Sequence, residues 1–158
     1  TRIEQRINLA SDFYLFDTPG MLWPKITVEK SGYHLAASGA VGRNAYDEEE
    51  VALELIESLQ GPYADRLSAR YTLADVASQT SEALLEAIGR KRGAVQSGGR
   101  FNPQKAAEAL LNDFRGGALG RITLETPEEY LQWLADADEE EAARAERKAE
   151  LRKAKKAK

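Results

Sequence analysis

The strongest constraint on the fold of this chain is a series of helix-start and helix-stop signals through its middle. Asp47 and Asn102 are residue types that cap helix amino termini, and Pro103 is favoured at a first helical position. A third cap falls at Thr80 or Ser81. Apolar residues follow these caps at helical spacing: Val51, Leu55, Ile56 and Leu59; Leu84, Leu85 and Ile88; and Ala106, Ala107, Leu110, Leu111 and Phe114. Because glycines follow each stretch, the pattern predicts separate amphipathic helices around one core.

Weaker signals predict three further helices. Residues 32–42 (GYHLAASGAVG) are rich in small side chains, which suits a short helix packed closely against another. A helix is also expected from Tyr63 to Tyr71, with Leu67 facing inward. Residues 126–129 (TPEE) cap a last helix, which carries Tyr130, Leu131 and Leu134.

The start of the chain has the pattern of a β-hairpin. Residues 3–9 alternate apolar and polar side chains, and residues 10–12 suit a turn. Phe13 to Phe16 are apolar and aromatic enough for a buried strand, which would place Asp17 at its carboxyl end. The predicted fold class is therefore mainly α: a hairpin, an all-helical domain of about five helices and a charged tail.

Composition excludes several kinds of protein. With no cysteine among its 158 residues, the chain can form neither disulfides nor thiolate metal sites. No apolar stretch approaches the roughly 20 residues that span a bilayer. Since 30% of the residues are charged, we expect a soluble, cytoplasmic protein without a membrane partner.

The net charge of −4 conceals a separation of charge along the chain. Residues 45–89 are strongly acidic, whereas residues 90–121 hold only Glu108 and Asp113 against seven cations. These cations are Arg90, Lys91, Arg92, Arg100, Lys105, Arg115 and Arg121. The mean charge argues against nucleic acid, but this local surplus allows it. Residues 136–158 end in RKAKKAK and suit a solvated helix or a disordered tail better than a specific binding arm.

Residues 17–20, Asp-Thr-Pro-Gly, are a candidate for nucleotide chemistry. At the end of a buried strand, Asp-x-x-Gly recurs in nucleoside-triphosphate switches, where the carboxylate holds a magnesium-bound water and the glycine amide senses the γ-phosphate. A purely structural turn fits four residues equally well. Neither G-x-x-x-x-G-K-[ST] nor Asn-Lys-x-Asp occurs in the chain. Residues 97–100 (SGGR) look like a phosphate cradle, but a loop between two helices is the better interpretation.

Longer segments resemble a known family. DTPGMLWPKI, preceded by TRIEQRINL, resembles the third guanine-nucleotide motif and preceding switch of the circularly permuted ribosome biogenesis GTPase A family. The resemblance continues in order through LAASGAV, EAIGRKRG, SGGRFNPQKAAEALLNDFRGG and LGRITLE, and covers about residues 1–125. In that family the guanine-specificity motifs and the phosphate loop precede the switch, and a helical RNA-binding domain follows. The amino-terminal GTPase portion is therefore expected upstream of Thr1.

The resemblance implies a nucleotide site shared with that upstream portion. Thr1 would reach Mg²⁺ and the γ-phosphate of GTP, Asp17 would hold the Mg²⁺ through a water, and Gly20 would offer its amide to the γ-phosphate. Met21 stands where many GTPases use glutamine to orient the attacking water. A thioether cannot do this, so a histidine of the upstream portion is implied instead. This chain alone should neither bind GTP tightly nor hydrolyse it.

The resemblance also implies three regions: residues 1–28 as the end of the GTPase domain, residues 29–135 as an RNA-binding domain, and residues 136–158 as the tail. The seven cations would contact ribosomal RNA of the large subunit. The alternative is a non-enzymatic helical RNA- or protein-interaction module with a remnant hairpin. His34 is expected to have a packing role or to lie at the surface rather than to bind a ligand. Trp23 is expected to lie in the core or to anchor a domain interface rather than to stack on bases.

Overall fold

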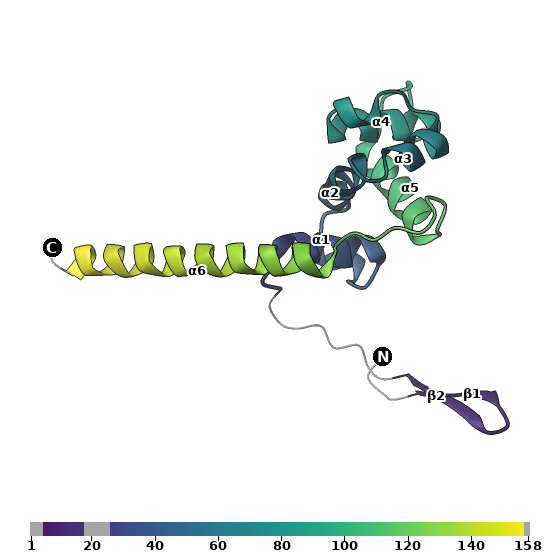
Figure 1. Ribbon diagram of the computed structural model, residues 1–158. Coiled ribbons are helices and arrows are strands. Elements are labelled where there is room, and N and C mark those ends of the chain that lie inside the picture. The colour runs from purple at the N-terminus through teal and green to yellow at the C-terminus, as the bar shows by residue number, and fades with distance from the viewer. Residues whose placement is uncertain (1–4, 18–25, 157–158) are drawn as a thin grey trace.

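A computed structural model describes residues 5–17 and 26–156 of the chain (Figure 1). Strand β1 (Gln5–Ala10) pairs antiparallel with strand β2 (Phe13–Asp17). The α-helices of this part are α1 (Glu29–Ser38), α2 (Glu48–Gln60), α3 (Ala64–Tyr71), α4 (Ser81–Lys91), α5 (Pro103–Arg115) and α6 (Pro127–Lys156), with short 3-10 helices at Arg43–Ala45 and Val76–Ser78. The predicted fold class, mainly α with a small hairpin, is confirmed.

The expected caps define the helix starts. Asp47 accepts hydrogen bonds from two backbone N–H groups at the start of α2, at 2.8 and 3.1 Å. Thr80 and Asn102 each accept one at the starts of α4 and α5, at 3.3 and 3.1 Å. At α6, Thr126 and Glu129 exchange side-chain-to-backbone hydrogen bonds in a reciprocal capping box. Local sequence therefore decides where these helices begin.

Helix α1 begins earlier than expected. It covers Glu29–Ser38 rather than residues 32–42, and it ends because Gly39 adopts a left-handed conformation with φ +84°. Ala36 and Ala37 are buried, as close packing of small residues requires. The bounds of α1 were mispredicted, but the close packing of its small side chains was predicted correctly.

The core lies among α1, α2, α4 and α5, and α5 packs against each of the other three. All the apolar stripe residues predicted for α2, α4 and α5 are buried except Phe114, which is half-buried. Leu67 of α3 is fully buried as expected. Helix α5 is thus the central helix of the domain, and its remaining faces determine which side chains reach the surface together.

The second strand of the hairpin is not buried as predicted. Phe13, Tyr14, Leu15 and Phe16 are 41–63% exposed. The sheet has only two strands, so no third strand or helix of the described chain covers either of its faces. An isolated two-stranded hairpin is marginally stable at best in water. The prediction failed because apolar composition shows that a strand needs a cover but not where the cover comes from.

Helix α6 continues through the boundary expected at residue 136. Its 30 residues correspond to a length of about 45 Å, and Figure 1 shows it extending well beyond the other helices. Of the two forms expected for the tail, the described part is a solvated helix. No helix in the described part of the chain is long and apolar enough to cross a membrane.

Gly89 of α4 provides a test of the core packing. A Cβ atom at this position would lie 2.6 Å from Cε2 of Phe101 and 2.7 Å from Cβ of Ala106. Gly89→Ala should therefore lower the free energy of unfolding by about 1–2 kcal/mol, because overpacking outweighs the gain of about 1 kcal/mol in helix propensity. Urea unfolding measures the change. The control Gly61→Ala meets no atom within 4 Å, and equal effects of the two substitutions would contradict the packing.

Candidate functional site

The described chain includes only part of the expected nucleotide site. Asp17 ends strand β2, and its backbone lies opposite that of Gln5 in the hairpin register. Thr1, Gly20 and Met21 lie outside the described residues, as does Trp23. In residues 5–17 and 26–156, no group of His, Asp and Glu side chains is placed to hold a metal ion. The basic segment, residues 90–121, lies entirely within the described residues.

Arg115 has a structural role at the end of α1. Its guanidinium donates hydrogen bonds to the carbonyl oxygens of Ala36 and Ala37 at 2.8 and 2.9 Å, and to the hydroxyl of Tyr46 at 2.9 Å. The last carbonyls of a helix lack partners and carry the negative end of its dipole, so a cation there is stabilising. Arg115 is half-buried by these contacts, which fasten α1 to α5.

Two further cations of the segment are paired with acids. Arg90 forms an ion pair with Glu86 one turn earlier on α4, at 2.6 Å. Arg92, just after α4, donates to the buried carboxylate of Asp113 at 3.2 Å. Both arginines remain largely exposed, at 56% and 41%. Pairing reduces their net contribution to the local field without removing them from the surface.

The other four cations are exposed and have no ion pair in the described part of the chain. Lys91 is the last residue of α4, and Arg100 lies in the loop between α4 and α5. Lys105 lies in the first turn of α5, and Arg121 lies in the loop after α5. The loop at residues 97–100 joins two helices, as expected, and Gly98 and Gly99 both have positive φ. These four side chains are available to a partner.

Asp113 joins three helices through four hydrogen bonds. Arg70 of α3 donates to both of its carboxylate oxygens, at 3.1 and 3.2 Å, and Tyr71 donates its hydroxyl at 3.0 Å. The fourth bond comes from Arg92, so one buried carboxylate holds two partly exposed guanidinium groups side by side. Sequence reasoning missed Arg70 because it lies in a segment that is acidic on average.

The protonation states in this cluster follow from its contacts. Burial disfavours the charged form of Asp113, but hydrogen bonds from Arg70 and Tyr71 and the charge of Arg92 outweigh burial and lower the pKa of Asp113. Burial and the adjacent Asp113 raise the pKa of Tyr71, so its hydroxyl remains a donor. The carboxylate is therefore charged at neutral pH and orients both arginines.

Arg66, one turn before Arg70 on α3, is also fixed from another element. Its guanidinium donates to the carbonyl oxygens of Leu119, at 3.4 Å, and of Arg121. The loop can approach this closely because Gly120 has no side chain: a Cβ there would lie 2.9 Å from Nη1 of Arg66. The only sequence signal for Arg66 and Arg70 was their spacing of four residues, which places them on one helix face.

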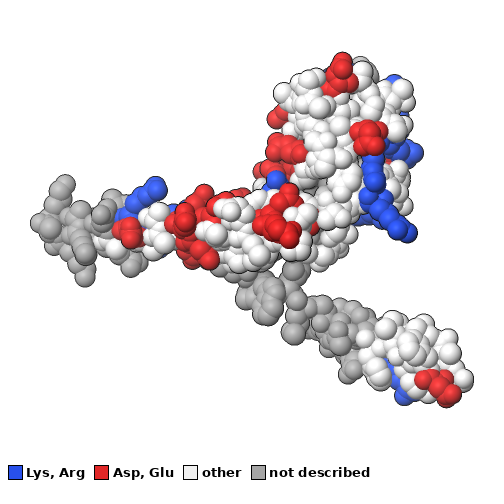
Figure 2. Space-filling view, in the orientation of Figure 1, with Lys and Arg blue, Asp and Glu red and all other residues white. Residues whose placement is uncertain are grey.

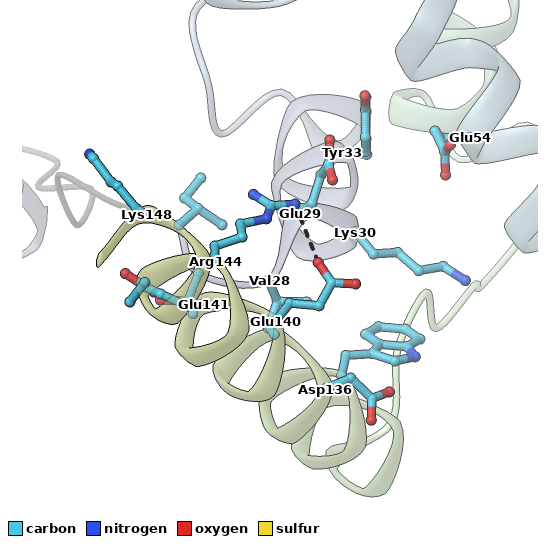
Figure 3. Close-up of a pocket in the computed structure, with 15 residues that line it drawn as sticks. Val28, Glu29, Lys30, Tyr33, Glu54, Asp136, Glu140, Glu141, Arg144 and Lys148 are labelled. Carbon is cyan, nitrogen blue, oxygen red and sulfur yellow. Dashed lines mark hydrogen bonds and ion pairs between the residues drawn. The ribbon is translucent and has the colours of Figure 1, made fainter. Parts of the chain in front are cut away.

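A groove of about 870 Å³ lies between α1 and α6 (Figure 3). Its charged residues are five acids and three bases: Glu29, Glu54, Asp136, Glu140 and Glu141, and Lys30, Arg144 and Lys148. Burial, followed by the charge of Glu57, raises the pKa of Glu54. The acidic surplus is unsuitable for a polyanion.

His34 connects α6 to the helical domain. Its ring nitrogens lie 3.0 Å from Oε2 of Glu125 and 3.1 Å from Oγ of Ser58. The ring of Trp133 packs edge-on against His34 at 6.0 Å, and Nζ of Lys30 lies 4.8 Å from the centre of that indole. His34 is 7% exposed, which agrees with the expected packing role.

Charge is distributed unevenly over the molecule. Figure 2 shows acidic side chains over α1, over the adjoining part of α6 and at several places on the helical domain, and a group of basic side chains along one edge of that domain. Helix α3 contributes to the basic side although the segment from residue 45 to residue 89 is acidic overall, because Arg66 and Arg70 meet the loop after α5. Folding thus gathers cations that the sequence separates.

The hairpin and the helices together define a mainly α protein with a group of basic side chains on its helical domain. Comparison with known proteins identifies its relatives. The chain is 36% identical to ribosome biogenesis GTPase A of Bacillus cereus over 138 residues, or 87% of this chain and 46% of that protein. It is 39% identical to the protein of the same name from Bacillus pumilus over 128 residues, or 81% and 45%. A Priestia megaterium homologue is 35% identical over 132 residues. No family model matches.

The chain is thus a relative of ribosome biogenesis GTPase A, and the expected resemblance is confirmed. It spans slightly less than half the length of the curated relatives it matches.

The Asp113 cluster can be tested through stability. Asp113→Asn keeps the shape of the side chain but removes its charge, and should lower the free energy of unfolding by about 2 kcal/mol at neutral pH. Because the pKa of Asp113 is lower in the folded chain, its contribution is present above the unfolded value near 3.9 and is lost as pH falls through the folded value. The difference in the free energy of unfolding between the unsubstituted chain and Asp113→Asn, measured with urea, should therefore disappear in acid. A gap independent of pH, or an equal loss in the exposed control Asp138→Asn, would contradict this role.

Proposed function

We propose that this chain is part of a GTP-binding protein required for assembly of the large ribosomal subunit, that it acts in the cytoplasm, and that its helical domain binds ribosomal RNA. The observation that carries the proposal is the ordered similarity to ribosome biogenesis GTPase A over more than four-fifths of the chain. Four exposed cations without ion pairs among the described residues, Lys91, Arg100, Lys105 and Arg121, support the RNA contact.

The hairpin supports the nucleotide half of the proposal. Its apolar side chains, including Phe13 and Phe16, are exposed in this chain, and exposed apolar surface of this kind marks an interaction site. We infer that an upstream GTPase portion covers it and completes the site with Thr1, Asp17 and Gly20. GTP and Mg²⁺ would bind there, with Asp17 holding the ion through a water.

Nucleotide would control RNA binding through the position of the two parts. GTP would hold the switch residues and the helical domain in an arrangement competent for the ribosome, and hydrolysis would release it. The alternative is a helical RNA- or protein-interaction module with a remnant hairpin. The sequence upstream of Thr1 distinguishes the two, since only the GTPase requires a phosphate loop there.

The RNA interface is tested by removing three of the four exposed cations that have no ion pair among the described residues. The triple variant Lys91→Gln, Arg100→Gln and Lys105→Gln should bind large-subunit ribosomal RNA more weakly. Its log–log salt dependence should also flatten by roughly 0.7–0.9 per lost phosphate contact. Arg92 and Arg115 are left intact because they hold Asp113 and α1. The matched control is Lys153→Gln, Lys155→Gln and Lys156→Gln. If this tail variant loses more affinity in filter binding over a salt series, the RNA interface is misplaced.

The nucleotide site is tested in the full-length protein. Asp17→Ala should reduce Mg²⁺-dependent GTP hydrolysis by about 10- to 100-fold, as loss of a residue that orients a metal-bound water does. Met21→Ala should change it much less, because a thioether contributes neither a proton nor a strong acceptor. Single-turnover assays measure both. An equal loss in the two variants, with folding intact, would reverse the assigned roles.

A further inference from the structure

We propose that the two arginines of α3, Arg66 and Arg70, form a seat for a phosphate of the RNA backbone. Together with Ala69, Ala118, Leu119 and Gly120 they line a shallow hollow of about 450 Å³. This inference rests on the proposed RNA binding and adds a contact outside the basic segment from Arg90 to Arg121.

The lining of the hollow suits an anion. Arg66 and Arg70 are one helical turn apart and flank Ala69, whose small exposed side chain leaves the space between them open. Ala118 and Gly120 provide the facing wall and are also small. No acid lines the hollow, in contrast to the groove beside α6.

Both guanidinium groups are held in place by other elements before any ligand arrives. Arg70 donates two of its five N–H groups to Asp113, and the other three can donate to a ligand. Arg66 donates to backbone carbonyls, so no acid neutralises its charge there. Arginines fixed in this way lose little side-chain entropy when they bind, and a planar guanidinium matches phosphate geometry.

The electrostatic balance around the hollow is positive. Of the two arginines that line it, Arg66 donates only to backbone carbonyls, and Arg70 shares the single charge of Asp113 with Arg92. Asp113 is buried and its four hydrogen bonds come from within the chain, so it orients the cations while they face outward. A phosphodiester carries one negative charge and two accepting oxygens, and the RNA backbone is the source of such groups that the proposed function supplies.

The experiment uses the whole chain with purified large-subunit ribosomal RNA as the probe. The double variant Arg66→Gln and Arg70→Gln should lower affinity by about tenfold or more, since charge-assisted hydrogen bonds are lost. Its salt slope should flatten by roughly 0.7–0.9 for each lost phosphate contact. Arg144→Gln with Arg147→Gln on α6 removes the same charge from exposed positions elsewhere, and should have little effect.

A second measurement does not depend on the stability of the double variant. Ala69→benzoylphenylalanine keeps both arginines and should photo-crosslink to the RNA, whereas the same residue at the exposed position Ala142 of α6 should not. Inorganic phosphate is tested separately as a competitor of the crosslink.

The outcomes separate the two proposals. If the unmodified chain does not bind the RNA, the proposed function fails and this inference fails with it. If the RNA binds but the double variant matches its control and position 69 does not crosslink, the hollow is not a contact and the proposed function stands. Occupation by inorganic phosphate without any crosslink to RNA would also overturn the inference.

Discussion

The helical domain depends on the buried carboxylate of Asp113. It is the point at which α3, the end of α4 and α5 meet, through hydrogen bonds from Arg70, Tyr71 and Arg92. A charge buried without partners would be strongly destabilising. The partners satisfy it while leaving their own guanidinium groups partly in solvent. The same interaction therefore stabilises the packing of three helices and decides where two positive charges appear on the surface.

The basic segment serves two purposes that a count of its cations does not separate. Arg115 interacts with the carboxyl end of α1 and links α1 to α5, so the charge of Arg115 acts within the fold. Lys91, Arg100 and Lys105 have no such internal acceptor in the described residues and define the exposed field. Arg92 lies between these cases, since it is bound to Asp113 and still 41% exposed. The presence of an acceptor within the fold, rather than charge alone, distinguishes a structural cation from an available one.

Much of the helical fold could be predicted because its determinants are local. The predicted caps Asp47, Thr80 and Asn102 do begin helices. Apolar residues at helical spacing after a cap, such as Val51, Leu55 and Leu59, are buried. Features that depend on distant residues were missed. The meeting of Arg70 with Asp113 and the bond between His34 and Glu125 join residues 43 or more positions apart. Burial of the strand Phe13–Asp17 likewise needs a surface that its own sequence does not specify. Periodicity carries no information about such pairs.

The same distinction applies to charge. A net charge of −4 is unfavourable on average for RNA binding, but exposed charges act over only about 8 Å at physiological salt. Five acids line the groove beside α1 and α6, whereas Arg66 and Arg70 line a hollow whose other lining residues are not acidic. The groove's acidic surplus disfavours any orientation that would bring α6 against phosphate. Because the charge is unevenly distributed, a net charge of −4 does not argue against the proposed RNA contact at the hollow.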